Sequence, residues 1–452
     1  MFKLRGKLLF VSAVFFLFSL EIASAQQVAP AGSDVLWPMP TWQTTTPAAA
    51  GMDSSLLIQA RDYALTAGGS GIITRGGQVV MSWGDLTTRY DLKSATKSIG
   101  SIALGLAIQD GKMTLGGTAA SYNPYFAAQI LDSGDPAWVN QITIRQIATQ
   151  TAGFYKPGYG QGLLFQPGTM WSYSDGGPNW LAQTITVVYQ QDLKVLLFNR
   201  AFTPMGLTGN DLTWRSNLYF PTSVNGVPVR EFGSGISADV DALARIGYLY
   251  LREGYWVNQQ IIPQSFVDQV RTSVPGVVGL PELTPETHGN ASDHYGLFWW
   301  NNADGTLANV PRDAYWGWGL NESLIIVIPS LDIVAVRSGT TGWQYPWKPD
   351  YNVIRPFIEP IVQSVQTNLA PVIQSVTAVP NTINTGQTSQ LTVTATDPDQ
   401  SPAMLTYHWQ ILSGGGSLNN SAIASPTYTA PGTGGIVTLQ VTVSDGEASV
   451  QQ

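Results

Sequence analysis

Ser94-Ala95-Thr96-Lys97 places a serine and a lysine three residues apart, on one face of a predicted helix. At that spacing a neutral lysine amine can reach the serine hydroxyl and remove its proton, which makes the serine a usable nucleophile. The pattern is short enough to arise by chance, and it occurs once in this chain. Apolar residues then recur at helical spacing until Gly111. Ser94 therefore lies at a helix start, where it is either an ordinary N-cap or a nucleophile whose anionic intermediate the free backbone N–H groups stabilise.

Further segments follow this motif in a characteristic order. They are TIRQIATQTAG (143–153), FQPG (165–168), WSYSDGG (171–177), GSGISADV (233–240) and IIVIP (325–329). This order, over about residues 51–368, resembles the serine β-lactamase and penicillin-binding-protein superfamily in its class C-like branch. That branch also holds D-aminopeptidases, carboxylesterases and amide-oligomer hydrolases. The resemblance implies an α/β (α+β) β-lactamase-like fold, with an antiparallel sheet flanked by helices and a mostly helical lobe.

The resemblance also assigns roles to single residues. Ser94 corresponds to the nucleophile, Lys97 to its activating partner, and Tyr173 to the tyrosine of the family's Tyr-x-Asn motif. A tyrosine beside a cationic lysine can take the proton of Ser94 and later pass it to the leaving group. The oxyanion is expected between the backbone N–H groups of Ser94 and Leu320.

Two departures from the family pattern bear on the substrate. Asp175 stands where the family commonly has asparagine, and this charge is expected to hold Lys97 cationic and favour a phenolate base. The third motif aligns with Gly317-Trp318-Gly319, and no lysine or histidine lies in residues 315–323 to read a substrate carboxylate. Asp175, Trp318, Gly319 and Leu320 are the predicted substrate-binding residues, and an uncharged ester or amide is preferred over a β-lactam or a peptide with a free carboxylate.

The aromatic residues of this region allow two interpretations. Either they line an apolar acyl-binding cleft, or they pack in the core; we favour the core for most of them, namely Trp299, Trp300, Tyr315 and Trp316. Trp318 is the exception, because its strand lies beside the nucleophile and its side chain is expected to face the cleft.

Other chemistries lack their signatures in this sequence. No Gly-x-Ser-x-Gly, dinucleotide-binding or P-loop pattern occurs, and the chain has no cysteine. His288 and His294 stand in a predicted loop without metalloprotease spacing, so no catalytic role is expected for them. We therefore predict that the protein uses no cofactor and no metal.

The first 25 residues read as a secretory signal peptide. A basic start precedes an apolar run from Leu8 to Leu20 and the small residues Ala23-Ser24-Ala25; the run is too short for a membrane span. Cleavage after Ala25 would remove three basic residues and one acidic residue, which changes the net charge from −8 to −10. An acidic mature chain without a basic cluster excludes nucleic acid and anionic membranes as expected partners. We predict an exported protein, periplasmic or extracellular, without a membrane span.

Composition predicts the domain boundaries. Residues 26–50 form a linker, residues 51–368 the β-lactamase-related domain, and residues 369–452 a β-sandwich. This last segment has no lysine or arginine, and strand-like alternation in it surrounds Tyr407-His408-Trp409. It resembles the immunoglobulin-like and PKD-like modules of secreted bacterial enzymes, which space, dock or bind carbohydrate or a surface. Asp397 and Asp399 are read as a solvated turn in preference to a Ca²⁺ site.

Together these features predict an exported serine hydrolase that cleaves an ester, an amide or a peptide-like small molecule through an acyl-enzyme on Ser94. Two alternatives stay open: a non-catalytic binding protein with the same fold, and a penicillin-recognising β-lactamase or D,D-peptidase.

Overall fold

The computed structural model describes residues 35–129, 136–156, 161–344, 348–365, 370–397, 405–446 and 448–452. The predicted signal peptide, the first part of the predicted linker and the predicted boundary at residues 368 and 369 lie outside the described residues.

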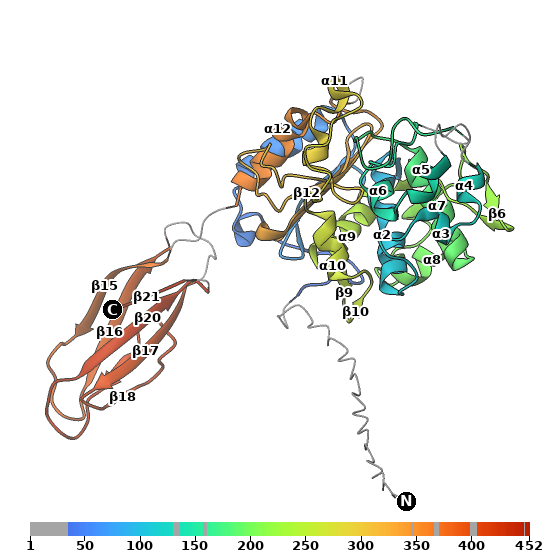
Figure 1. Cartoon of the computed structure of the whole chain (residues 1–452). Helices are drawn as coiled ribbons and strands as arrows, with labels where there is room; N and C mark the ends of the chain where they lie inside the picture. The colour runs from blue at the N-terminus through green and yellow to red at the C-terminus, as the bar shows by residue number, and fades with distance from the viewer. Residues whose placement is uncertain are drawn as a thin grey trace, which may run out of the picture. The chain divides into compact units, whose positions relative to one another are not determined.

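A seven-stranded sheet forms the centre of the large domain (Figure 1). All neighbouring strands are antiparallel except β1 and β3, which are parallel. Strands β2 and β3 form a β-hairpin, as the turn residues Gly76 and Gly77 between two apolar runs indicate, and both glycines have positive φ. In sheet order the strands are β1 (Gln43–Thr44), β3 (Gln78–Trp83), β2 (Ser70–Arg75), β14 (Ile333–Ser338), β13 (Ser323–Ile328), β12 (Tyr315–Gly319) and β11 (Trp300–Asn301).

Helices cover both faces of this sheet and create two hydrophobic cores. Helices α1 (Ser54–Leu65) and α12 (Tyr351–Gln363) pack together on one face, over Ile326 and Ala335. Helices α2 (Ala95–Gln109) and α9 (Val240–Leu251) cover the other face, over Ile325 and Val336. Because side chains of a strand alternate between its faces, neighbouring residues of β13 and β14 enter different cores. The sheet with helices on both faces confirms the predicted fold class.

The rest of the large domain is mostly helical, as predicted. Its helices gather beside α2 (Figure 1), and a capping box of Thr143 and Gln146 begins one of them, α6. These helices are α3 (Ala119–Tyr122), α4 (Phe126–Gln129), α5 (Pro136–Gln141), α6 (Ile144–Ala148), α7 (Gly176–Tyr189) and α8 (Leu193–Leu197). Shorter elements elsewhere are β6 (Ser223–Val224), β7 (Val227–Pro228), β9 (Tyr255–Trp256), β10 (Gln259–Gln260), α10 (Gln264–Val270) and α11 (Pro285–His288).

A small second sheet anchors the segment that leads into α2. Strand β8 (Ile236–Ala238) pairs with β4 (Tyr90–Asp91) on one side and with β5 (Leu212–Trp214) on the other. The Ile236 carbonyl accepts from the Leu92 N–H, and the Ile236 N–H donates to the Thr96 hydroxyl. The start of α2 is therefore held at a defined distance from the loop that precedes β8.

The C-terminal module consists of two antiparallel sheets, as predicted. Trp409 is buried in their shared core with Leu391, Val393 and Val441. One sheet is β15 (Val372–Val379), β16 (Thr388–Thr396), β19 (Thr427–Thr429) and β18 (Ser417–Leu418); the other is β17 (Thr406–Ser413), β20 (Thr438–Ser444) and β21 (Ser449–Gln451).

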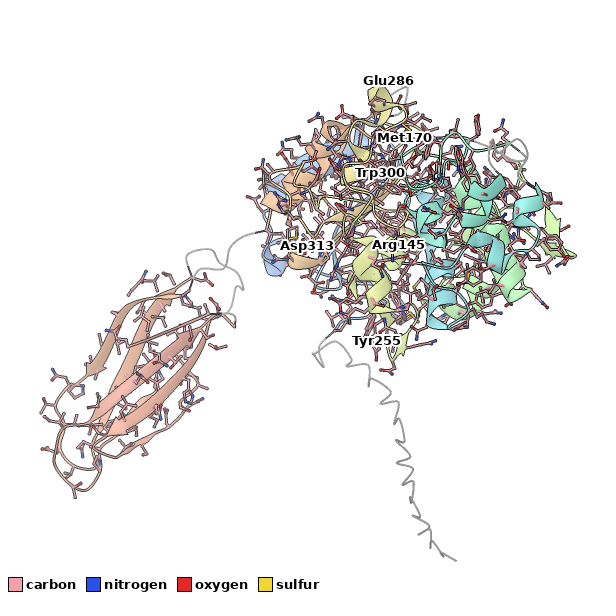
Figure 2. The ribbon with its side chains drawn as sticks, in the orientation of Figure 1. Arg145, Met170, Tyr255, Glu286, Trp300 and Asp313 are labelled. Carbon is pink, nitrogen blue, oxygen red and sulfur yellow. The ribbon has the colours of Figure 1, made fainter. Side chains whose placement is uncertain are left out.

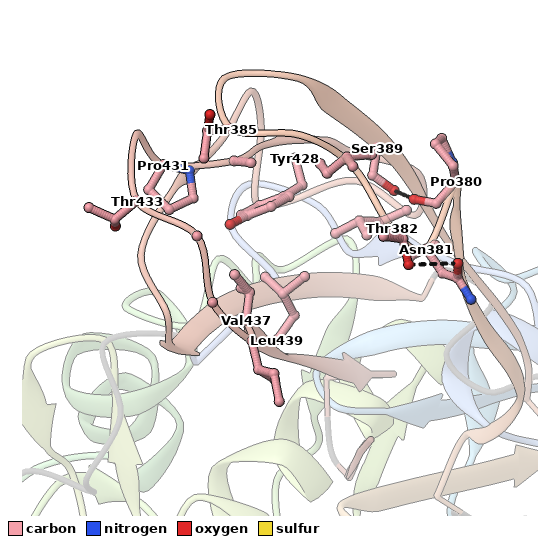
Figure 3. Close-up of a pocket in the computed structure, with 17 residues that line it drawn as sticks. Pro380, Asn381, Thr382, Thr385, Ser389, Tyr428, Pro431, Thr433, Val437 and Leu439 are labelled. Atoms are coloured by element: carbon pink, nitrogen blue, oxygen red, sulfur yellow. Dashed lines mark hydrogen bonds between the residues drawn. The ribbon is translucent and has the colours of Figure 1, made fainter.

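A pocket of about 370 Å³ lies in this module, where Tyr428, Pro431, Val437 and Leu439 contribute to its wall (Figure 3). Carbohydrate binding by the module stays a prediction. Along the described chain, no helix combines the length and apolarity that a membrane crossing needs.

Candidate active site

Ser94 occupies the N-cap position of α2, and its side chain is half-buried. Its hydroxyl does not cap the helix, since no backbone N–H within the described α2 donates to it. Instead, it accepts a hydrogen bond of 3.1 Å from Lys97 Nζ and shares a second hydrogen bond with the Tyr173 side chain. The two predicted partners therefore meet at one oxygen atom.

Lys97 is buried, and its Nζ forms three hydrogen bonds. Only 1% of its surface is exposed. Besides Ser94, its Nζ donates to Asp175 Oδ1 at 2.5 Å and to the Gly233 carbonyl at 2.8 Å. An ammonium would donate to all three oxygens, whereas a neutral amine would donate to Asp175 and Gly233 and accept the Ser94 proton. The same geometry thus serves both protonation states.

Tyr173 is enclosed by aromatic rings. It stacks on Trp300 and His288 at centroid distances of 6.0 and 5.9 Å, and Tyr295 contacts it edge-on. Trp300, labelled in Figure 2, is itself buried in the core. These contacts fix the ring orientation, so that the phenol oxygen is directed by packing rather than by chain flexibility.

One buried glutamine holds the segment that carries Tyr173 and Asp175. Gln150 Oε1 accepts from both the backbone N–H and the hydroxyl of Ser174, and Gln150 Nε2 donates to the Ser174 carbonyl. Gln150 has a positive φ of 63°, a conformation that costs energy for a residue other than glycine. Gln150 belongs to the segment 143–153. This segment therefore holds the later segment 171–177, which leads into α7, in place.

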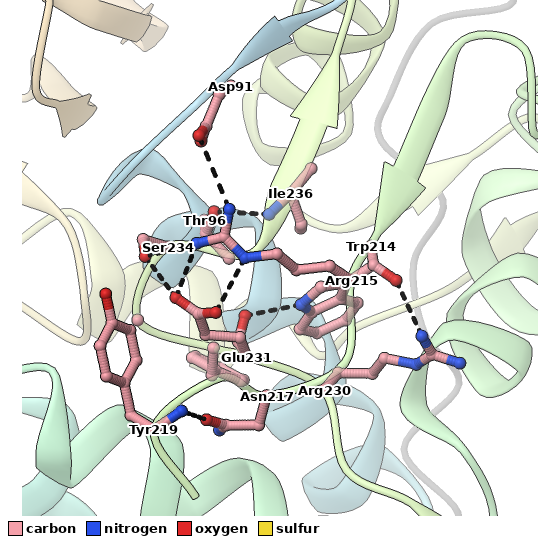
Figure 4. A network of polar contacts seen from close by, with 12 residues as sticks. Asp91, Thr96, Trp214, Arg215, Asn217, Tyr219, Arg230, Glu231, Ser234 and Ile236 are labelled. Atoms are coloured by element: carbon pink, nitrogen blue, oxygen red, sulfur yellow. Dashed lines mark hydrogen bonds and ion pairs between the residues drawn. The ribbon is translucent and has the colours of Figure 1, made fainter. Parts of the chain in front are cut away.

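The carbonyl of Gly233 is held toward Lys97 by two side chains. Asn179 Oδ1, on α7, accepts from the N–H groups of Phe232 and Gly233. The fully buried Glu231 pairs with Arg215 at 2.8 Å, and its backbone carbonyl accepts from the indole of Trp214 (Figure 4). A β-carbon at Gly233 would lie 2.9 Å from Cβ of Asp175, so only glycine fits there.

Strand β12 lies against the start of α2. A β-carbon on Gly319 would lie 2.1 Å from the Leu92 carbonyl oxygen and 3.2 Å from the Ser94 nitrogen. The predicted third motif is thus beside the nucleophile. Leu320 follows immediately and is 36% exposed.

Trp318 does not lie where we expected it. Strand alternation turns Gly317 and Gly319 toward α2 and turns Trp318 to the opposite face, where it is 1% exposed and packs near Trp300 and Tyr351. Its indole belongs to the core, in the same cluster as Trp300. The core interpretation is confirmed for the other aromatic residues of the region, all of which are buried: Trp299, Trp300, Tyr315 and Trp316.

Burial shifts the pKa values of the two candidate proton acceptors in opposite directions. It lowers the pKa of Lys97, and the attraction of Asp175 offsets this only in part. It raises the pKa of Tyr173, and the negative charge of Asp175 raises it further. For Asp175 burial acts upward, but the charges of Lys97 and Lys156 outweigh it and hold its pKa below the usual value. The phenolate that we expected Asp175 to favour is therefore disfavoured in the resting site.

The sequence did not place two side chains near Tyr173: Lys156 was not considered, and His288 was assigned to a loop, whereas it ends α11. Lys156 Nζ lies 5.0 Å from the Tyr173 ring centroid and 4.0 Å from Asp175 Oδ2. His288 stacks on Tyr173 and lines a pocket of about 360 Å³; burial lowers its pKa to about 4, so it is neutral at pH 7. Neither residue belongs to a local motif, so no sequence signal could have placed them here.

Within the described ranges, no group of three or more histidine and acidic side chains is arranged to hold a metal ion. Asp397, half of the weighed Ca²⁺ alternative, is described, whereas Asp399 is outside the described residues.

The sequence model of the β-lactamase family matches residues 57–338, which is more than half of the chain. Among solved structures, a penicillin-binding protein homologue from Caulobacter crescentus has 14% identity and a TM-score of 0.53, covering 70% of this chain and 99% of its own. The hydrolase EstCE1, described as having promiscuous acyltransferase activity, has 16% identity and a TM-score of 0.52 (69% and 99% covered). A family VIII carboxylesterase has 14% identity and a TM-score of 0.52 (70% and 99% covered). No curated protein matches the chain.

The fold defines the class of this protein as that of the β-lactamase-like serine hydrolases and penicillin-binding proteins. The chain belongs to the β-lactamase family.

Proposed function

We propose that this protein is a serine hydrolase that cleaves an ester or amide through an acyl-enzyme on Ser94. The observation that carries the proposal is the meeting of Lys97 Nζ and the Tyr173 side chain at the hydroxyl of a half-buried Ser94. In this proposal the oxyanion of each tetrahedral intermediate is bound by the backbone N–H groups of Ser94 and Leu320.

Lys97 is the proposed acceptor of the Ser94 proton, because its pKa is lowered while that of Tyr173 is raised. The Ser94 oxygen attacks the substrate carbonyl, and the proton moves to Lys97 Nζ. Tyr173 then donates its proton to the departing alcohol or amine and recovers one from Lys97. In the second half, water attacks the acyl carbonyl and gives a proton to the Lys97 and Tyr173 pair, which returns it to the Ser94 oxygen as the carbon–oxygen bond to Ser94 breaks.

The substrate is proposed to be a small ester, with an amide as the second choice. No lysine or histidine stands on or directly after β12 to bind a carboxylate, which argues against efficient β-lactam or D,D-peptide hydrolysis. The similarity to a carboxylesterase and to a hydrolase with acyltransferase activity agrees with this choice.

Labelling with a fluorophosphonate probe tests the catalytic role of Ser94. The wild-type protein should become labelled at Ser94, and the Ser94→Ala variant should not, because the probe forms a covalent bond with an activated serine oxygen. A folded wild-type protein that resists labelling would favour the non-catalytic binding protein instead.

A substrate panel tests the proposed specificity. A short-chain aryl ester should be hydrolysed with a higher kcat/KM than a chromogenic cephalosporin. The reverse ranking would identify a penicillin-recognising enzyme and show that a cation on β12 is not required.

We further propose that the protein is exported and that the signal peptide is removed after Ala25. N-terminal sequencing of the protein recovered from the periplasm or medium should then begin at Gln26. Retention of an uncleaved chain in the cytoplasm would contradict this proposal.

A further inference from the structure

Asp175 has two lysine neighbours, one on each carboxylate oxygen. Lys97 Nζ lies 2.5 Å from Oδ1, and Lys156 Nζ lies 4.0 Å from Oδ2. Both ammonium nitrogens also lie over the Tyr173 ring, at 4.8 and 5.0 Å from its centroid. The two lysines therefore share one carboxylate and one aromatic ring within a single small site.

The two lysines differ in their access to water. Lys97 is buried, whereas half of the Lys156 side chain is exposed. Water can stabilise the charge of Lys156, but the charge of Lys97 depends on its protein neighbours. Like charges repel, so a proton on Lys156 makes protonation of Lys97 less favourable.

Other charged groups near Lys97 come from three elements, and most are neutralised by their own partners. Glu231, in the loop before β8, is paired with Arg215, and its negative charge still raises the pKa of Lys97. Asp91 on β4 is paired with Lys93 at 2.7 Å. His288 on α11 is neutral at pH 7. Asp175 is therefore the closest counter-ion of Lys97. Because Asp175 also interacts with Lys156, its pairing with Lys156 affects the pKa of Lys97.

We propose that Lys156 is a positioning residue that draws the charge of Asp175 away from Lys97 and so keeps Lys97 able to accept the proton of Ser94. The proposal rests on the proposed function. It explains how a site can carry an aspartate beside the lysine without locking that lysine in its cationic form. Burial lowers the pKa of both lysines and the charge of Asp175 raises both, so the two lysines share one counter-ion.

The experiment compares the pH dependence of kcat/KM for an aryl ester in the wild-type protein and in Lys156→Gln. Removing the charge should stabilise protonated Lys97, so the acidic limb should move upward by about one pH unit. At a pH on that limb kcat/KM should fall about tenfold, while the plateau at high pH is retained. The rate of fluorophosphonate labelling should show the same shift without any contribution from substrate binding.

Two variants control the measurement. Lys156→Arg retains the charge and should keep the wild-type limb. Lys112→Gln removes a lysine beyond the far end of α2, about 22 Å from Ser94 along a helix of 15 residues, and should also leave the profile unchanged. Thermal melting should show that all variants are folded.

An acidic limb that stays in place in folded Lys156→Gln would overturn the proposal. So would a rise in KM at every pH without a shift, because Lys156 would then bind substrate, and so would an equal shift in Lys156→Arg. Absence of Ser94 labelling in the wild-type protein would instead refute the proposed function, so the two failures are distinguishable.

Discussion

At the scale of single residues, the protonation of Lys97 depends on a balance of neighbours. Burial removes water from its amine, Asp175 attracts its proton and Lys156 repels it. The family commonly has asparagine where this chain has Asp175, an amide that would hydrogen-bond to the lysine without a negative charge. In this chain the second lysine, Lys156, lies 4.0 Å from the other carboxylate oxygen of Asp175.

Replacing Asp175 with asparagine should move the acidic limb in the direction opposite to that for Lys156→Gln. Without the carboxylate, protonated Lys97 loses its counter-ion and its pKa falls. The limb of kcat/KM should therefore shift to lower pH by about one unit, equivalent to about 1.4 kcal/mol. The pH profile measured with an aryl ester checks this, and an upward shift in the folded variant would contradict it.

At the scale of elements, the contact between β12 and α2 determines the geometry around the nucleophile. Glycines at 317 and 319 allow the strand to approach the helix start, where a side chain would overlap Ser98 or the backbone of Leu92. Strand alternation turns the two glycines toward α2 and buries Trp318 on the other face of the sheet. The close packing thus sets the position of β12, and of the segment that follows it, beside the nucleophile.

Replacing Gly319 with alanine should separate β12 from α2. Its β-carbon would lie 2.1 Å from the Leu92 carbonyl oxygen and 2.9 Å from the Ala95 nitrogen, so the backbone must move. Overpacking of this kind costs about 1–3 kcal/mol. We expect a lower melting temperature and at least a tenfold slower labelling of Ser94, since the two proposed N–H donors would no longer converge.

Gly116→Ala is the matched control, because a β-carbon there meets no atom within 4 Å. It should leave melting and labelling unchanged. Wild-type labelling in Gly319→Ala would show that the separation of β12 and α2 does not control the nucleophile.

At the scale of the whole molecule, most buried hydrophobic side chains of the described residues fall into three clusters. Two of them lie on the faces of the seven-stranded sheet. The third contains only residues of the C-terminal module, with Trp409 and Val441 among them. Neither of the first two clusters contains a residue of the C-terminal module. The large domain therefore has a hydrophobic core of its own.

A chain that ends after Val365 should therefore keep the catalytic domain folded. We expect Ser94 labelling at the rate of the full chain and an unchanged kcat/KM for a small aryl ester. Circular dichroism melting and the labelling rate measure this. Aggregation or loss of labelling on truncation would show that the large domain depends on the C-terminal module.

The sequence by itself determined the elements whose signals are local. The Ser94 and Lys97 spacing, the β2–β3 hairpin, the helical lobe and the alternating strands around Trp409 follow from periodicity and turn chemistry, because neighbours in the chain supply those constraints. Only the tertiary structure decided which face Trp318 takes, and it brought Lys156, in a loop, and His288, on α11, to Tyr173. Those placements depend on strand alternation and on contacts between distant segments. The pKa of Lys97 also depends on the tertiary structure, because burial lowers it more than the neighbouring Asp175 raises it.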